Sequence, residues 1–384
     1  MKNMFWIISL LLIQTIQLEA AESKKIRIVS TANVHGETDP CGWKKKPLGG
    51  LARKATIVDN LRSEGFDVVI LDAGNLFFKR DKLDPGTPTE SAKKTAEIIV
   101  SGFNGIGCHA FSPGSKDFAA GLQFVQNMQK IAEFPFISSN IEDSNGNRIF
   151  DPYTIIDIDN VSIGIIGLAS TFNHSDVYIK NPIEALGEIV NEVDSQVDIV
   201  ILLFDSQESD ISKIHQLNYP IDLIVRSKAK TQSTDGGNKN TLVYSCGDRG
   251  KYIYQFDLNI IEPNGNFVDL AFYNKQISRA QKKLEKMKQG NLVADLRTLY
   301  KDDPITLKKI ETYEKQIETS NKAIANSVNT ITLTKHSLDK NISDRPDILK
   351  IVDEGKAERT KLFGPLLPEK FVPHDHDGDG KPDH

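Results

Sequence analysis

Two apolar stretches near the N-terminus, each followed by a polar turn, constrain the fold of this chain more than any other feature. Residues 26–30 read I-R-I-V-S, and residues 68–71 read V-V-I-L. Between them, apolar residues recur at every third or fourth position from Leu51 to Leu61, which predicts an amphipathic helix. In an α/β sheet, ligands bind at the carboxyl ends of the strands. We therefore expect a functional site in the polar turns that follow these two strands.

Further apolar strands alternate with helical patterns as far as about residue 260. Residues 161–168, 198–204 and 221–225 are short, continuous apolar runs. Such runs are typical of strands in sheets that are covered on both faces. We therefore predict one α/β domain over residues 25–265.

The composition changes from about residue 274 onward. Two amphipathic stripes, rich in Lys and Glu on their outer faces, flank a turn at Asp303-Pro304. This pattern predicts an antiparallel helical hairpin over residues 274–330. We expect a short helical or irregular extension over residues 331–370 and a polar tail over residues 371–384.

The N-terminus has the pattern of a targeting segment. Lys2 precedes an almost wholly apolar run from Met4 to Ile16, and Ala20 offers a small residue at a cleavage position. We predict a signal peptide over residues 1–20 and an exported protein, periplasmic or extracellular, with no stable membrane span after cleavage. An uncleaved N-terminal anchor is the alternative.

Charge and cysteine content exclude some classes of function. The 384 residues carry a formal net charge of −5, so we expect no nucleic-acid partner. The three cysteines, Cys41, Cys108 and Cys246, allow at most one disulfide bond, and the pairing stays open. No two of them form a C-x-x-C motif, so we expect neither a zinc ribbon nor a haem attachment site.

Several motifs resemble the metallophosphoesterase domain of the 5′-nucleotidase family, which has the calcineurin-like fold. T-A-N-V-H-G, L-G-G-L-A-R and L-D-A-G-N occur in the family's order, followed by C-H-A-F-S-P-G-S-K-D-F and F-P-F-I-S-S-N. The resemblance implies a four-layer α/β/β/α sandwich, followed here by the C-terminal helical hairpin. It also implies two divalent metals at the strand ends, where they would hold a phosphate ester and supply a hydroxide.

The positions that match the family's metal ligands carry other residues in this chain. Only one histidine persists, and two carboxylate positions hold carboxamides. An Asn-His pair of the family is replaced by Ser-Lys, and lysines stand near two later histidine positions. The matching positions are Asn33, His35, Asn75, Ser115, Lys116, Lys228 and Lys230.

These replacements bear directly on metal binding. Two divalent ions about 4 Å apart repel each other strongly and need anionic ligands. We therefore expect no dinuclear metal site and no confident catalytic residue. Two alternatives stay open: a single ion on Asn33, His35 and Asn75, or a metal-free anion site where Lys116, Arg226, Lys228 and Lys230 would cluster.

The tail contains alternating aspartates and glycines. Asp375, Asp377, Asp379 and Asp383 lie in the pattern D-x-D-G-D-G-x-x-D, which resembles the aspartate-rich calcium loops of thrombospondin type-3 and dockerin-like repeats. Hard oxygen ligands in a tight loop suit Ca²⁺. We predict calcium binding there, with a solvated acidic tail as the alternative.

These observations favour a catalytically inactive homologue that acts as a binding or scaffold protein, with the helical hairpin as the surface for a protein partner. Asp39-Pro40-Cys41-Gly42 resembles a turn in exported relatives that carry haem, which suggests a redox or cell-surface partner. The alternatives are an active metal-dependent phosphoesterase with a remodelled site and a metal-free anion-binding protein.

Overall fold

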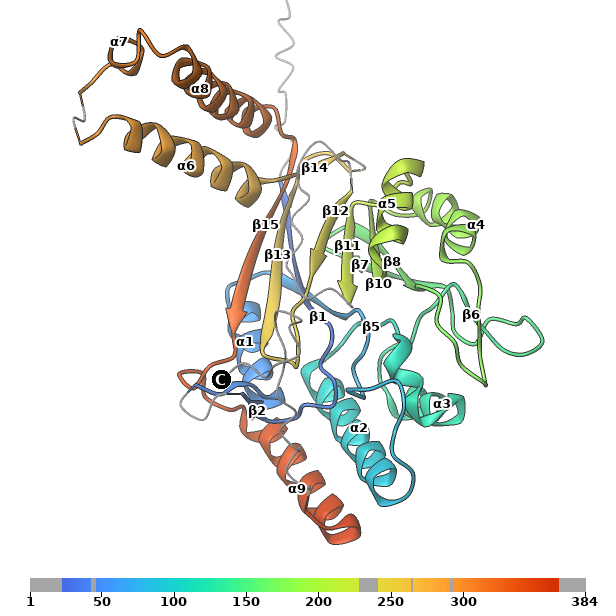
Figure 1. Ribbon diagram of the computed structural model, residues 1–384. Coiled ribbons are helices and arrows are strands. Elements are labelled where there is room, and N and C mark those ends of the chain that lie inside the picture. Colours follow the sequence, from blue (N-terminus) through green and yellow to red (C-terminus); the bar gives the residue numbers. More distant parts are fainter. Residues whose placement is uncertain (1–22, 43–45, 228–240, 264, 291–292, 366–384) are drawn as a thin grey trace, which may run out of the picture.

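Two β-sheets pack face to face, and helices cover both outer faces (Figure 1). The computed structural model describes residues 23–42, 46–227, 241–263, 265–290 and 293–365. This arrangement confirms the predicted α/β fold with an α/β/β/α layer order.

The first sheet has six strands in the order β14-β15-β13-β1-β4-β5. Its central strand, β1, runs parallel to β4 and antiparallel to β13, with Lys24 opposite Ile260. The strands are β1 Lys24–Thr31, β4 Asp67–Asp72, β5 Ala110–Phe111, β13 Tyr252–Ile260, β14 Phe267–Asp269 and β15 Asn329–Ser337.

The second sheet has five strands in the order β12-β11-β10-β8-β7. Adjacent strands run parallel, except β7 and β8, which are antiparallel. Its strands are β7 Tyr153–Ile158, β8 Val161–Ala169, β10 Ile199–Asp205, β11 Leu223–Ser227 and β12 Leu242–Ser245. Two small ribbons add β2 Pro40–Cys41 with β3 Leu48–Gly49, and β6 Ile141–Glu142 with β9 Tyr178–Ile179.

The core consists of three apolar layers. The middle layer lies between the sheets and includes Ile28, Val69 and Leu203. One outer layer joins the first sheet to α1 Leu51–Ser63, α2 Thr87–Ile106, α3 Leu122–Ile131 and α9 Pro346–Phe363. The other joins the second sheet to α4 Pro182–Asp194 and α5 Glu208–Leu217. Because both faces of the sheets are covered there, strands such as β4 and β10 are buried along almost their whole length.

Two long helices project from one end of the sandwich (Figure 1). They are α6 Leu270–Met287 and α8 Pro304–Ala325, and the short α7 Leu296–Leu299 lies between them. The side chains of Asp269 and Asp303 accept hydrogen bonds from the first turns of α6 and α8, which fixes where each helix begins. This pair, here called the helical hairpin, leaves the body after β14 and returns into β15.

Residues 331–370 differ from the predicted short helical or irregular extension. They begin inside β15, which pairs with β13 over its whole length, and they continue into the 18-residue helix α9. The alternating residues Ile331 and Leu333 place their apolar side chains toward the middle layer. Helix α9 packs closely on α2 because Gly355 lies against Ile98, where an added Cβ would come within 2.5 Å. Both elements therefore belong to the sandwich.

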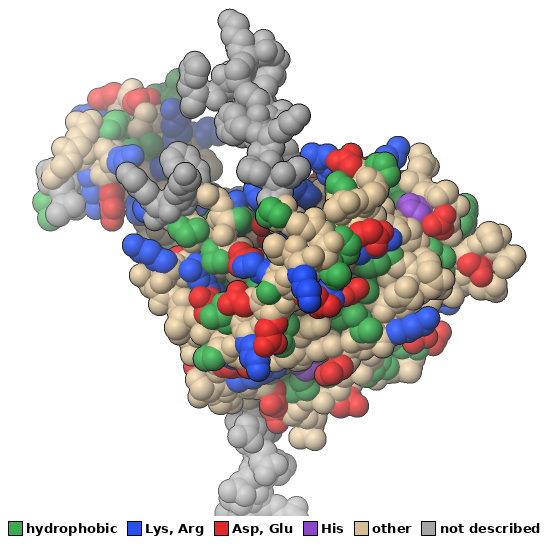
Figure 2. All heavy atoms as spheres, turned by 90° about the horizontal axis from the view of Figure 1, so that it is seen from below, with side chains coloured by type: hydrophobic (Ala, Val, Ile, Leu, Met, Phe, Trp, Pro, Cys, Tyr) green, Lys and Arg blue, Asp and Glu red, His purple; other side chains and the backbone are tan. Residues whose placement is uncertain are grey.

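The surface carries no large field of one charge on the face seen from below, where positive and negative side chains are interspersed (Figure 2). This pattern agrees with the small net charge of the chain. None of the helices in the described ranges has the length and apolarity that crossing a membrane requires.

Candidate functional site

The carboxyl ends of four parallel strands, two from each sheet, meet at one place in the sandwich. β1 and β4 lead into the turns that carry Asn33 and Asn75. β10 ends at Asp205 and β11 ends at Ser227. These four side chains, here called the Asn75 centre, are all buried. The expectation of a polar site at these strand ends therefore agrees with the geometry.

Asn75 makes hydrogen bonds to the other three side chains of this centre. Its amide nitrogen donates to Asn33 Oδ1 at 3.2 Å, to Asp205 Oδ1 at 3.0 Å and to Ser227 Oγ at 3.4 Å. Ser227 Oγ in turn donates to Asp205 Oδ1 at 2.7 Å. The amide group of Asn75 thus lies among three oxygen atoms, and its partly positive hydrogens face a buried carboxylate.

The orientation of the Asn75 amide is set by its other end. The backbone N–H of Lys116 donates to Asn75 Oδ1 at 3.1 Å. If the amide were turned over, its NH₂ group would face this N–H donor, and its oxygen would face the oxygens of Asn33 and Asp205. Both contacts would then be repulsive, so the nitrogen faces the centre.

The backbone of both turns adopts an uncommon conformation. Asn33, His35 and Asn75 have φ values of 55°, 59° and 56°. Asparagine tolerates this left-handed region better than most residues. Gly74, with φ 104°, lies so close to Ser112 that an added Cβ would come within 2.7 Å of its carbonyl oxygen. The turns thus keep a shape that presents side chains at the strand ends.

Ser115 and Lys116 contribute their backbone to the site. They begin the 3₁₀ helix η1 Ser115–Ala120, and Ser115 N–H donates to Asp205 Oδ2 at 2.7 Å. Burial lowers the pKa of the Lys116 ammonium, while Asp248 and Asp205 raise it by their negative charge. The positive charge of Lys116 therefore lies near carboxylates, which reduces its availability to an outside anion.

Asp117 ties the turn after β4 to η1. Its carboxylate accepts the backbone N–H groups of Asn75, Phe77 and Gly114, each at 2.8 Å. Burial raises its pKa to about 7, although these hydrogen bonds oppose the shift. We did not single out Asp117 from the sequence.

His35 faces away from the Asn75 centre. Its Nε2 lies 3.3 Å from Asp248 Oδ1, and its Nδ1 lies 3.3 Å from the carbonyl oxygen of Phe78. Both ring nitrogens therefore have polar partners outside the centre. This geometry disfavours the alternative of a single ion shared by Asn33, His35 and Asn75.

Arg226 does not join the expected cluster of lysines, which corrects that part of the sequence-based alternative. It pairs with Glu208 at 2.7 Å and donates to the carbonyl oxygen of Ser206 at 3.4 Å. Neighbouring residues of a strand point to opposite faces, so Ser227 faces the Asn75 centre while Arg226 faces away. The other two members, Lys228 and Lys230, lie outside the described residues.

The donor set does not suit two divalent metals. The Asn75 centre offers two carboxamides, one hydroxyl and one carboxylate, and the NH₂ group of Asn75 stands among the oxygens. Within the described part of the chain, no three His, Cys, Asp or Glu side chains are arranged to hold a metal ion. A dinuclear site needs several anionic ligands to offset the repulsion between its ions.

Asp205 and Ser227 were missed as site residues from the sequence. Both end apolar strands, and a polar residue directly after such a strand is a signal that could have identified them. The family resemblance implies a histidine near the end of the strand that finishes at Leu203, and this chain has Phe204-Asp205-Ser206 there. The predicted calcium ligands Asp375, Asp377, Asp379 and Asp383 lie outside the described residues.

The three cysteines are free thiols. Cys108 and Cys246 are buried, and burial raises the pKa of Cys108 to about 12. Neither is therefore a reactive nucleophile in the folded protein.

Comparisons with known proteins give the fold and show which sequences this chain resembles. The chain is 30% identical to protein UshA of Salmonella pullorum over 200 residues, which is 48% of this chain and 34% of that protein. It is 32% identical to a 5′-nucleotidase of Vibrio cholerae over 161 residues, which is 40% of this chain and 27% of that protein. The chain thus spans about a third of the length of these relatives. No family model matches the sequence.

Among solved structures, the calcineurin-like phosphoesterase YfkN from Bacillus subtilis superposes with a TM-score of 0.60 at 15% identity, covering 89% of this chain and 99% of that one. The fold is therefore that of a calcineurin-like metallophosphoesterase. The matched sequences, which include 5′-nucleotidases, support the resemblance to the 5′-nucleotidase family over the part of the chain that they cover.

Proposed function

We propose that this protein is an exported, catalytically inactive member of the 5′-nucleotidase family that serves as a binding or scaffold protein. One observation carries the proposal. The Asn75 amide nitrogen donates to Asn33 Oδ1 and Asp205 Oδ1, at the strand ends where the family resemblance implies metals. The signal-like residues 1–20 support export.

The charges in the centre support the same proposal. A metal pair brings four positive charges, and the Asn75 centre offers one carboxylate, Asp205, to offset them. The same carboxylate is already satisfied by Asn75, Ser227 and the backbone of Ser115. A metal would have to displace these hydrogen bonds and would gain neutral amide oxygens in return. Such an exchange is unfavourable for a doubly charged ion in a buried site.

Metal analysis and a hydrolysis assay test the proposal together. The full chain would be purified without chelator, and its metal content measured by mass spectrometry after incubation with Mn²⁺ and dialysis. Hydrolysis of 5′-AMP and of an aryl phosphate would be followed with Mn²⁺ present. We expect well below one metal per chain and no turnover above that of a heat-denatured sample. Two tightly held metals, with hydrolysis that His35→Ala abolishes, would overturn the proposal.

The binding role is proposed for the helical hairpin. It projects from the sandwich (Figure 1) and carries exposed apolar side chains, including Ile305 and Leu299. Arg297 of the connecting helix α7 pairs with Glu314 of α8, which holds the connecting segment against the second long helix. A surface of this kind suits a protein partner. A hairpin variant with Ile305→Glu and Leu299→Glu should keep the thermal midpoint and lose partner capture, and capture at wild-type strength would contradict this role.

The proposed calcium loop at residues 375–383 has its own test. Isothermal titration of Ca²⁺ into the full chain, compared with a chain that lacks residues 374–384, should give heat only for the full chain. Equal signals from both would end that proposal.

A further inference from the structure

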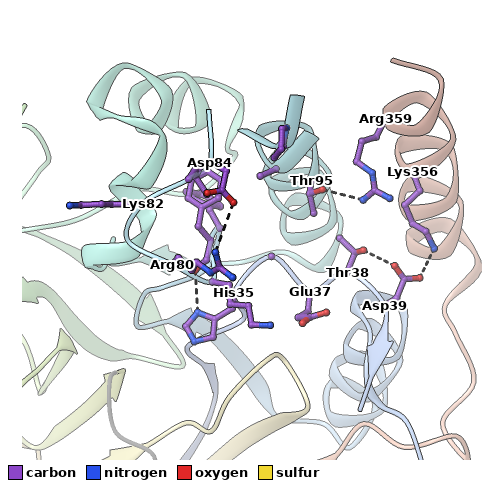
Figure 3. A pocket seen from close by; sticks show the side chains of 17 residues that line it. His35, Glu37, Thr38, Asp39, Arg80, Lys82, Asp84, Thr95, Lys356 and Arg359 are labelled. Carbon is purple, nitrogen blue, oxygen red and sulfur yellow. Dashed lines mark hydrogen bonds and ion pairs between the residues drawn. The ribbon is translucent and has the colours of Figure 1, made fainter. Parts of the chain in front are cut away.

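A cavity of about 470 Å³ lies on the helical side of the first sheet (Figure 3). Its walls come from the loop after β1, the loop after β4, helix α2 and helix α9. Volumes of this size hold small organic ligands. Helix α9 supplies two cations, Lys356 and Arg359, which point toward α2 and the loop after β1 (Figure 3). We call this cavity the Arg359 pocket.

Arg359 is an unusually placed cation. Its residue is 6% exposed, and its guanidinium donates one hydrogen bond, from Nη1 to Thr95 Oγ1 at 3.1 Å. Within the described part of the chain, its buried Nε has no hydrogen-bond partner. Burial also lowers the pKa of the guanidinium. A buried charge that is satisfied by a single hydroxyl group is unfavourable on its own.

The carboxylates that line the same pocket are engaged with other cations. Asp39 pairs with Lys356 at 2.6 Å, and Glu37 accepts a hydrogen bond from Arg249 Nε at 2.8 Å. Asp84 lies 3.9 Å from Arg80 on the exposed rim. Among the described residues, no carboxylate lies within ion-pair distance of Arg359. Its guanidinium therefore faces the pocket without an ion pair, and Asp39, which is engaged with Lys356, acts on it only from a longer distance.

A purely structural role accounts poorly for Arg359. Helix α9 is already held on α2 by the close approach of Gly355 to Ile98 and by the ion pair of Lys94 with Glu358 at 2.9 Å. An apolar side chain at position 359 would fill the same space without the cost of a buried charge. A residue that is unfavourable in the free protein and points into a cavity is typical of a binding site.

We propose that the Arg359 pocket binds a small organic oxyanion, whose carboxylate or phosphate group is held by Arg359 and Lys356. The planar guanidinium presents donors in the geometry that such groups accept. The remainder of the ligand lies against Leu83, Pro88 and Ala92, which line the pocket on the side of α2. This inference is independent of the proposed function, because none of the Asn75 centre's side chains lines the pocket.

Calorimetric titration of the full chain tests this inference with defined probes. Phenyl phosphate and benzoate carry an oxyanion on an apolar ring, and benzamide is a neutral analogue of similar shape. At constant ionic strength, we expect at least one of the two anions to bind and benzamide to give no signal. Benzoate cannot be hydrolysed, so its binding is informative even if the protein proves to be an active phosphoesterase.

Variants locate the binding. Arg359→Met should lower the affinity for the anion by at least about tenfold, because the charge-assisted hydrogen bonds are lost. Its thermal midpoint without ligand should equal or exceed that of the wild type. Lys350→Met removes a charge from an exposed position of the same helix and should leave affinity unchanged. Arg359→Lys keeps the charge without the planar fork and should bind with intermediate affinity, which also provides a folded variant if Arg359→Met does not fold.

Three results would overturn the inference. The first is that neither anion binds the wild-type protein. The second is that Arg359→Met, or Arg359→Lys where the former does not fold, binds as tightly as the wild type. The third is that Lys350→Met weakens binding as much as the Arg359 variants do, because the effect would then be one of net charge.

Discussion

The Asn75 centre and the Arg359 pocket both include residues of the loop that follows β4. They differ in whether their buried polar groups are satisfied by hydrogen bonds within the protein. In the Asn75 centre, the amide and the carboxylate are buried and satisfy each other through short hydrogen bonds. In the pocket, a buried guanidinium has one hydroxyl partner and faces open space. A closed hydrogen-bond network needs no ligand, whereas an unsatisfied buried charge is stabilised by one.

Of the changes proposed here, Asn75→Asp should reduce the stability of the protein most. It would place a second carboxylate beside Asp205 and remove the donor that satisfies it. We expect the free energy of unfolding at pH 7.5 to fall by about 3–5 kcal/mol, the cost of an uncompensated buried charge. Urea denaturation of the variant measures this loss. The same isosteric change at the exposed Asn60 is the control, and an equal, small effect at both positions would contradict the closed network.

The pH dependence of stability should report on Asp72, which is buried at the end of β4. Burial raises its pKa to about 6, although Lys54 and the hydrogen bond from Thr31 oppose the shift. The folded state therefore holds a proton between pH 4 and 6 that the unfolded state has released, so stability falls as the pH rises through this window. The loss is up to about 3 kcal/mol for a shift of this size.

Asp72→Asn isolates this contribution, because its side chain has the same shape and does not titrate. The difference in unfolding free energy between wild type and variant should change with pH between 4 and 6 and stay constant above pH 7. Parallel pH profiles for the two proteins would show that Asp72 keeps an ordinary pKa.

Ser227→Ala should have a smaller effect within the Asn75 centre. The hydroxyl donates to Asp205 at 2.7 Å, and its removal leaves one oxygen of the buried carboxylate with one partner fewer. We expect a loss of about 1–2 kcal/mol in urea denaturation. Ser63→Ala, at an exposed helix end, provides the comparison. No loss at position 227 would mean that Asn75 and the backbone of Ser115 are enough to satisfy Asp205.

Lys356→Met should have the smallest effect on the free protein. The ion pair of Lys356 with Asp39 is partly exposed, so its loss should cost less than about 1 kcal/mol. Thermal unfolding, with Lys350→Met as the matched control, measures it. A loss above about 2 kcal/mol would mean that Lys356 holds α9 in place, and its role in the pocket would then be structural.

Much of the sandwich could be predicted from the sequence, because continuous apolar strands and family-like turns occur in order along residues 26–260. The strand β15 was not predicted, because residues 331–370 were interpreted as a short helical or irregular extension. Thr330, Thr332 and Thr334 are β-branched and alternate with buried or half-buried apolar residues, which favours a strand. Helix α9 was foreseen in part, but its packing on α2 depends on glycines far apart in the sequence.

Only part of the candidate site could be predicted, because only some of its residues lie in motifs that resemble a known family. Asn33, Asn75, Ser115 and Lys116 were identified because they stand at positions with a family motif, and they do meet in space. Asp205 was overlooked because the residue expected there was a histidine. Arg359 has no motif at all. Its partner Thr95 is 264 positions earlier in the chain, and single-sequence patterns do not report such distant pairs.

The position of β1 has a consequence for how the protein is made. The first strand of the fold is an interior strand, and its antiparallel neighbour β13 begins at Tyr252. Until that part of the chain has been synthesised, one side of β1 has no partner, and β13 itself awaits β15 beyond the helical hairpin. Pairings between such distant segments close slowly. The first sheet should therefore stay incomplete, with one side of β1 exposed to aggregation, until the segment beyond the helical hairpin has been synthesised.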